Sequence, residues 1–393
     1  MGTDSALSLL VIALGAFAVP LVSGRIGIPA AVGEILFGVA VGPAVLGLLT
    51  PAPFTLFLAE FGFAFLMFLA GLELDFTRIE RQGRGAVLRA LFVATLTNVA
   101  ALALTLAFGL PVYLFVAFGA VSVGILLVTL AETGRGRTGA GQALILAGSV
   151  GEFLTIVLLT GFAFYERFGF GGRLALEMAK LLVIMVAAYV ALVILRTLIW
   201  WFPRRFARLV VTHDPSEVGV RAGMALMLAF VALASLMGVK SILGAFVAGA
   251  LFSAVFREKG ILETKLSSVG FGFFVPIFFI DVGAQFQLGA MTQGSVLATL
   301  GLFLGVSAVA KVVGAIPLAL SPYGLKDGLG ASLLLGAPLT LLVVIARIGV
   351  DAKLIDETQA GALVLLAMVT SVLFPLGYRW LYRPVGASNS RAS

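Results

Sequence analysis

The chain has no cysteine and a single histidine, His213, among its 393 residues. Disulfides and thiolate-bound metal centres are therefore excluded, and so is a metal site built from several histidines. Charged residues are also scarce, at 11% against about 25% in soluble domains, whereas 61% of the residues are hydrophobic. This composition places the chain in a lipid bilayer.

Motifs that hold nucleotides or catalytic metals are missing from the sequence. It contains no Gly-Lys-Ser/Thr phosphate-binding loop, no His-Glu-x-x-His pair and no Asp/Asn-rich calcium loop. ATP hydrolysis is not supported, no cofactor is expected, and we expect the protein not to be an enzyme. An ion gradient, or the gradient of the substrate itself, would have to supply energy for any transport.

Long apolar runs take up most of the chain and predict an all-α polytopic membrane protein with about thirteen transmembrane helices. No basic segment precedes the first run, so we expect a retained helix and not a cleaved signal. The predicted spans are residues 6–23, 28–49, 54–74, 87–110, 112–131, 142–164, 175–202, 218–237, 241–256, 267–288, 294–320, 328–349 and 360–382.

Basic residues are unevenly distributed over the loops between these spans. If the N-terminus is outside, about 18 Lys and Arg residues fall on the cytoplasmic side and about 4 on the other. The asymmetry predicts an outside N-terminus and a cytoplasmic C-terminus. The net charge of +7 is then a sign of membrane topology, and no nucleic-acid partner is expected.

Two pairs of similar segments indicate an internal duplication. Gly33–Pro43 in the second span resembles Leu243–Phe252 in the ninth, and Phe68–Asp75 in the third resembles Phe278–Gln287 in the tenth. The pairs are seven spans apart, and an odd number of spans inverts the second copy in the membrane. Inverted repeats of this kind are typical of secondary transporters.

The duplication predicts the organisation of the chain as a single membrane transporter domain, residues 1–393, without a soluble regulatory domain. Residues 28–164 form the first inverted repeat and residues 241–382 the second. A linker helix at residues 175–202 joins them.

Glycine and proline interrupt two spans at matching positions in the proposed repeats. The fifth span contains Gly119 and Gly124, and the twelfth contains Gly336 and Pro338. Interrupted helices at membrane depth leave backbone groups unpaired, which is tolerated where they line a cavity or bind a solute. The pattern predicts two crossed broken helices at a transport site. Ordinary kinking for helix packing is the alternative.

One acidic residue, Glu152, lies in the middle of the sixth span. At about 1.5 Å per residue it is roughly 15 Å from Gln142, near the centre of a hydrocarbon core about 30 Å thick. A carboxylate at that depth is costly, so we expect it to face an ion path, a cavity or a partner. The alternative is a protonated side chain that hydrogen-bonds to a neighbouring helix and has no transport role.

Lys311 is the second buried charge of note, too far from either end of the eleventh span to reach water easily. If it meets Glu152, each charge lowers the desolvation cost of the other. A cation or proton arriving at Glu152 would then have to weaken that pair. A fixed structural ion pair is the alternative interpretation.

Four segments in this order, Gly33–Gly47, Leu58–Asp75, Leu243–Gly249 and Pro276–Gly283, resemble the bacterial sodium/potassium:proton antiporters of the cation:proton antiporter superfamily. The resemblance is greatest to the branch that holds NapA-type sodium/proton antiporters and glutathione-gated potassium efflux systems. It implies the sodium/proton antiporter fold and a homodimer in a bacterial-type inner membrane. Each subunit would have a dimer domain and a core domain that moves against it.

The resemblance also implies site residues. Glu152 takes the position of the family's ion-binding carboxylate, and Lys311 that of the lysine found in electrogenic members. Ser122 lies where the family often has a hydroxyl, and Ser122 and Ser149 are tentative cation ligands beside Glu152. The family usually has Asp preceded by Asp, Asn or Gln where this chain has Gly151-Glu152, so the ion and the stoichiometry are left open.

We therefore predict a secondary transporter that exchanges Na⁺ or K⁺ for protons by alternating access, with Glu152 as the shared site. A carrier of the same fold for another solute, such as an anion bound near Lys311, is the first alternative. A membrane sensor that transports nothing is the second.

Overall fold

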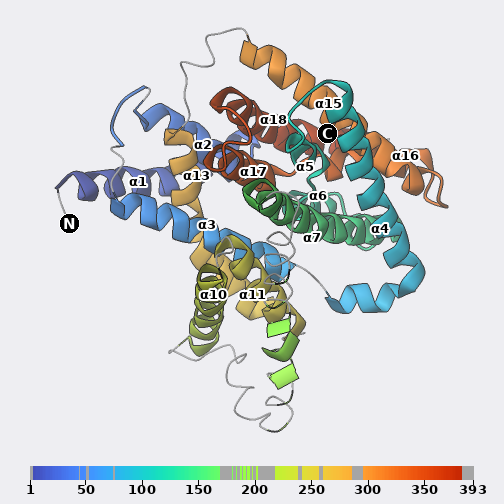
Figure 1. Cartoon of the computed structure of the whole chain (residues 1–393), viewed down its shortest axis with the longest axis horizontal. Helices are drawn as coiled ribbons and strands as arrows, with labels where there is room; N and C mark the ends of the chain where they lie inside the picture. Colours follow the sequence, from blue (N-terminus) through green and yellow to red (C-terminus); the bar gives the residue numbers. More distant parts are fainter. Residues whose placement is uncertain are drawn as a thin grey trace, which may run out of the picture. The chain divides into compact units, whose positions relative to one another are not determined.

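A computed structural model describes residues 3–43, 45–49, 53–73, 76–168, isolated positions between 179 and 201, 217–237, 241–255, 260–285 and 295–382. Within these ranges every regular element is a helix (Figure 1). Among the described residues, eight helices are long and apolar enough to cross a membrane, or nine if one bent pair counts as a span. The predicted all-α polytopic fold is thus confirmed. The count of thirteen stays a prediction because span 175–202 falls largely outside the described residues.

The chain divides into two compact units, each assembled from two separate segments of the chain. Unit 1 comprises residues 1–81 and 160–292, and unit 2 comprises residues 82–159 and 293–393. This division does not test the predicted single transporter domain or the repeat boundaries, which stay predictions.

Unit 1 holds the three N-terminal helices and the helices between residues 218 and 284. Its elements are α1 (Thr3–Ile26), α2 (Ala30–Val41), α3 (Pro53–Glu73), α10 (Val218–Leu236), α11 (Ser241–Val255), α12 (Gly260–Val269), a π-helical turn (Gly270–Phe274) and α13 (Val275–Ala284). The second predicted span, residues 28–49, is wrong in length. Helix α2 ends at Val41 because Pro43, two residues on, has no N–H with which to continue the helix.

Unit 2 holds both interrupted spans. Its elements are α5 (Leu114–Gly119), α6 (Gly124–Glu132), α15 (Ser295–Ala319), α16 (Gly324–Leu335), α17 (Leu339–Asp351) and α18 (Glu357–Leu381), together with most of α4 (Phe76–Ala107) and α7 (Gly139–Phe168). Helix α4 begins earlier than the predicted span at 87–110 and has a kink at Gly83, whose φ of 78° is not helical.

Backbone-to-backbone contacts hold α3 against α11 in unit 1. A Cβ atom added at Gly71 would collide with the carbonyl oxygen of Phe246, and one added at Gly249 would collide with that of Phe68. Small residues that let helices approach this closely are a common means of association in membranes, where lipid removes the hydrophobic driving force.

The contact between α2 and α13 repeats this arrangement (Figure 1). A Cβ at Gly38 would collide with the carbonyl oxygen of Ile280, and one at Gly283 with that of Ile35. Helix α2 carries the segment that resembles α11, and α13 carries the segment that resembles α3. In both crossings a glycine of each helix lies against a backbone carbonyl oxygen of the other helix, and these carbonyls belong to phenylalanine in α3–α11 and to isoleucine in α2–α13.

Substitution of Gly249 tests the importance of the α3–α11 crossing. We expect Gly249→Ala to lower the free energy of unfolding by about 1–3 kcal/mol, because the added methyl group must push two backbones apart. The control is Gly272→Ala, at a position where a Cβ would meet no other atom within 4 Å. Thermal denaturation of the purified protein in detergent measures both. Equal midpoints for the two variants would contradict this view of the crossing.

Candidate functional site

The fifth predicted span is interrupted between its two glycines. Helix α5 ends at Gly119 and α6 begins at Gly124, and the first break, residues 120–123, is buried throughout. A helix end leaves its last carbonyl groups, or its first N–H groups, without partners in the helix itself. The first break therefore presents carbonyl oxygens on one side and N–H groups on the other.

The twelfth predicted span is interrupted as well. Helices α16 and α17 are bent by 44° across the second break, residues 336–338. Gly336 ends α16, and Pro338 precedes α17, where its missing N–H is tolerated. The hydroxyl oxygens of Ser122 and Thr340 lie 3.5 Å apart, which brings the first break next to the start of α17.

Glu152 of α7 lies at the α6 side of the first break, and its side chain is 1% exposed. Its Oε2 accepts a hydrogen bond from the backbone N–H of Val123 at 3.2 Å, and its Oε1 accepts one from the Ser122 hydroxyl at 3.3 Å. Val123 immediately precedes α6, so the carboxylate lies at the positive end of this half-helix.

Lys311 of α15 lies at the opposite side of the first break and is also 1% exposed. Its Nζ donates to the carbonyl oxygens of Gly119 and Ala120, at 2.8 Å and 2.5 Å. These oxygens form the negative end of α5. Lys311 and Glu152 are thus brought to the same break, but the ammonium group binds backbone carbonyls and not the carboxylate. Each buried charge compensates one end of the interrupted helix.

Gly151, where the family usually has a polar residue, has a steric role. A Cβ at Gly151 would lie 3.1 Å from the β-carbon of Val121 in the first break, so the glycine lets α7 approach the break closely. Thr155, one turn after Glu152, also contacts the break, because its hydroxyl accepts a hydrogen bond from the Val121 N–H at 3.4 Å. The same hydroxyl donates to the Gly151 carbonyl at 2.8 Å.

The other two predicted ligands, Ser122 and Ser149, differ in whether they contact Glu152. Ser122 is in contact with Glu152, as described above. The Ser149 hydroxyl donates to the Ile145 carbonyl of its own helix at 3.0 Å, so its role as a cation ligand stays a prediction. Sequence reasoning missed Thr340 and Thr155. The signals that could have found them are a hydroxyl two residues after Pro338 in the second interruption and a hydroxyl three residues after Glu152.

A second polar cluster joins the α6–α7 loop to α16 and to the end of α18. Arg135 Nη2 lies 2.6 Å from Asp327 Oδ1, the Tyr382 hydroxyl donates to the same oxygen, and the guanidinium carbon of Arg135 lies 3.9 Å from the centre of the Tyr382 ring. Burial, and then the hydrogen bond to Asp327, raise the pKa of the Tyr382 phenol above its usual range.

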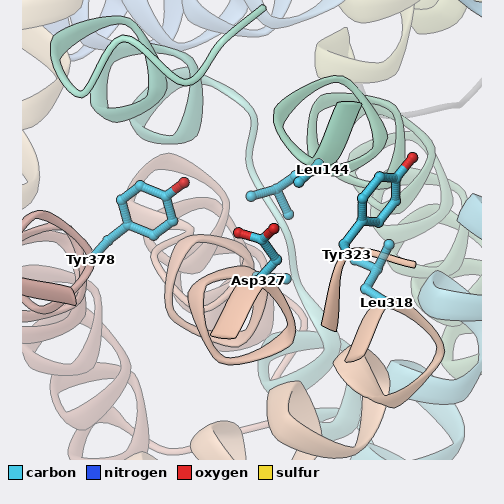
Figure 2. A pocket seen from close by; sticks show the side chains of 7 residues that line it. Leu144, Leu318, Tyr323, Asp327 and Tyr378 are labelled. Carbon is cyan, nitrogen blue, oxygen red and sulfur yellow. The ribbon is translucent and has the colours of Figure 1, made fainter. Parts of the chain in front are cut away.

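Figure 2 shows the Asp327 carboxylate pointing into a small cavity lined by Leu144, Leu318, Tyr323 and Tyr378. The cavity has a water-accessible volume of about 10 Å³, roughly the space that one water molecule needs. The Tyr323 hydroxyl is turned away from Asp327 (Figure 2). This cluster ties together the ends of the two interrupted spans, which also meet at their breaks.

Removal of the Asp327 charge tests the strength of this tie. We expect Asp327→Asn to lower the free energy of unfolding by about 1–2 kcal/mol, because the Arg135 guanidinium loses a charged partner in a mostly buried place. The matched control is Asp351→Asn, whose ion pair with Arg347 is longer, at 3.6 Å, and more exposed. That variant should change stability by less than about 0.5 kcal/mol. Both are measured by thermal denaturation. A larger loss of stability in Asp351→Asn than in Asp327→Asn would contradict the stabilising role of the Arg135–Asp327 ion pair.

The comparisons with known proteins agree on one family. Residues 10–383 match the family described as sodium/hydrogen exchanger, transmembrane. The chain is 30% identical to YjbQ of Bacillus subtilis over 348 residues, which cover 83% of this chain and 54% of that protein. It is 25% identical to the Na⁺/H⁺-K⁺ antiporter GerN of Bacillus cereus, over 85% of this chain and 84% of GerN. The chain thus spans about half the length of YjbQ.

One solved structure extends the comparison to the fold. The sodium proton antiporter MjNhaP1 of Methanocaldococcus jannaschii superposes with a TM-score of 0.65, over 96% of this chain and 97% of that one. Sequence identity in the superposition is 15%, so the likeness concerns the fold. The sodium/proton antiporter fold expected from the sequence is therefore confirmed.

Proposed function

Because the chain belongs to the transmembrane sodium/hydrogen exchanger family, we propose that it is a secondary transporter that exchanges Na⁺ or K⁺ for protons. The observation that carries the proposal is the buried Glu152 carboxylate at the first break, in hydrogen-bond contact with Ser122. A carboxylate in that position is able to hold either a proton or a cation, but not both at full strength.

The oxygen atoms around Glu152 suit an alkali cation. The carboxylate and the hydroxyls of Ser122 and Thr340 are hard oxygen ligands, the kind that such cations prefer. Unwound backbone in broken helices often completes ion sites of this kind in transporters. We therefore assign Thr340 to the candidate site together with the predicted Glu152 and Ser122.

Charge compensation explains how exchange stays coupled. With either a proton or a monovalent cation bound, the charge of the Glu152 carboxylate is neutralised, and only then is its passage through an apolar barrier inexpensive. An empty site leaves the carboxylate charged, with hydrogen bonds from the Ser122 hydroxyl and the Val123 N–H but no compensating proton or cation, and its movement through that barrier is disfavoured. The protein alternates between its two open states with one substrate or the other, and so exchanges them.

The structure gives the anion-carrier alternative less support. The Lys311 ammonium already donates to two carbonyl oxygens, and the Val123 N–H at the start of α6 already donates to Glu152. The two groups that would bind an anion at the first break, the ammonium and this N–H, therefore already donate hydrogen bonds to other groups of the protein.

The division of the chain also fits an antiporter. All residues assigned to the site lie in unit 2, so we propose that unit 2 is the moving core domain and unit 1 the dimer domain. The equivalent glycine contacts of α3–α11 and α2–α13 support the proposal of inverted repeats at 28–164 and 241–382. The homodimer stays a prediction of the family resemblance.

Replacement of Glu152 tests the proposal directly. In proteoliposomes with a preset pH gradient, we expect addition of Na⁺ or K⁺ to dissipate the gradient, and Glu152→Gln to abolish the response without loss of folding. An amide has no charge to neutralise and holds neither substrate. The control is Asp351→Asn, which removes an exposed carboxylate of the same unit and should leave exchange intact.

Two results of this assay would count against the proposal. Substantial cation-driven exchange by Glu152→Gln would exclude Glu152 as the shared site. A response of the wild type to anions alone, lost in Lys311→Ala, would favour the carrier of another solute.

Cysteine labelling tests the proposed topology, because the natural chain has no cysteine of its own. Arg137 in the α6–α7 loop and Ala352 in the α17–α18 loop are both exposed. The distribution of basic residues predicts that a membrane-impermeant thiol reagent added to intact cells labels Ala352→Cys but not Arg137→Cys. The reverse pattern would show that the orientation is inverted.

A further inference from the structure

Asn98 of α4 carries a buried amide oxygen without a hydrogen-bond partner among the described residues. The side chain is 8% exposed, and its Nδ2 donates to the carbonyl oxygen of Ala94 at 2.9 Å, within the same helix. Buried acceptors without a partner are uncommon in proteins, and each one calls for a specific reason. The Asn98 Oδ1 therefore marks a place where a donor is expected.

The Asn98 oxygen lies against the first break. A Cβ added at Gly119 would collide with Asn98 Oδ1, so this oxygen is in contact with the residue whose carbonyl accepts a hydrogen bond from Lys311. Glycine at position 119 is what allows the approach.

Helices α4 and α15 are also close at the neighbouring residue. A Cβ at Gly314 would collide with the hydroxyl of Thr97, the residue before Asn98. Gly314 follows Lys311 by three residues, about one helical turn, so both lie on the same side of α15. The close crossing at Thr97 therefore brings Asn98 and Lys311 into one neighbourhood through a second, independent contact.

An ammonium group has three N–H donors, and the structure accounts for two of them at Lys311. We propose that Asn98 is a positioning residue for Lys311: its Oδ1, which has no donor in the described conformation, accepts the third N–H when the flexible lysine side chain shifts toward α4. It then completes, with the carbonyl oxygens of Gly119 and Ala120, a cradle of three oxygens. Three acceptors match a charged ammonium. They match a neutral amine poorly, because the amine has two N–H groups and a lone pair.

The consequence for transport rests on the proposed function. While the cradle holds it, the ammonium stays at the negative end of α5 and leaves Glu152 to the substrates. When the cradle loses one oxygen, the flexible lysine side chain becomes free to approach the carboxylate and compete with the incoming cation. Loss of Asn98 should therefore weaken apparent cation affinity more than it slows the maximal rate of exchange.

The first test is a double-mutant cycle on thermal stability, which requires no transport. Asn98→Leu should lower the denaturation midpoint in the wild-type background and change it much less in the Lys311→Met background, where no ammonium needs the oxygen. The matched control is Thr105→Val, a buried residue of the same helix whose hydroxyl bonds only within α4, to the carbonyl of Ala101. Its effect should be equal in both backgrounds.

An equal effect of Asn98→Leu in the two backgrounds would overturn the proposal, because Asn98 would then act without Lys311. This result would leave the antiporter assignment untouched, since the cycle measures stability and not flux.

The second test separates a positioning role from a merely structural one. In cation-driven exchange, Asn98→Leu should raise the KM for the cation about tenfold, the size expected for loss of a hydrogen bond to a charged group, with a smaller change in the maximal rate. Asn98→Asp, which keeps an oxygen at this place, should retain a KM near that of the wild type. An unchanged KM in Asn98→Leu, or an equal rise in both variants, would contradict the proposal. A wild-type protein without flux would count against the proposed function instead.

Discussion

An interrupted helix in a membrane exposes a negative and a positive end of backbone in a medium that solvates neither. At the first break the protein meets both needs with its own buried charges. Lys311 binds the carbonyl oxygens that end α5, and Glu152 binds the N–H that precedes α6. The rest of unit 2 depends on this compensation, because it is what keeps the break stable at membrane depth and places a carboxylate there.

The same compensation gives Glu152 two tasks that conflict. The carboxylate stabilises the start of α6 while it is charged. In the proposed exchange it also binds a substrate that neutralises it. A proton and a monovalent cation carry the same charge to the same oxygen atoms, so each replaces the other with little change in the electrostatics of the break. Lys311 does not take part in this competition as long as its hydrogen bonds go to backbone carbonyls. The proposed exchange of one cation for the other rests on this separation of the two charges.

Much of this arrangement could be predicted from the sequence. Composition indicates the helical membrane fold, and Gly119, Gly124, Gly336 and Pro338 mark the two interruptions because few residues other than glycine and proline end a helix inside lipid. Glu152 and Lys311 stand out as single charges in apolar spans. Their opposite charges suggest a direct ion pair, but Lys311 hydrogen-bonds to backbone carbonyls instead. This arrangement could not be predicted, because the carbonyl oxygens that bind Lys311 become available only once α5 ends at Gly119. Thr340 and Asn98 gave no signal of comparable strength, since a lone hydroxyl or amide in a helix is ordinary until its neighbours are known.

Proton release on cation binding tests the central claim most directly. Purified protein in a weakly buffered solution with a pH indicator is mixed with Na⁺ or K⁺, and bound cation and released protons are counted together. If Glu152 holds a proton or a cation in turn, cation binding releases protons in the wild type and releases none in Glu152→Gln. Cation binding to the wild type without proton release, or release that persists in Glu152→Gln, would show that the two substrates do not share this carboxylate.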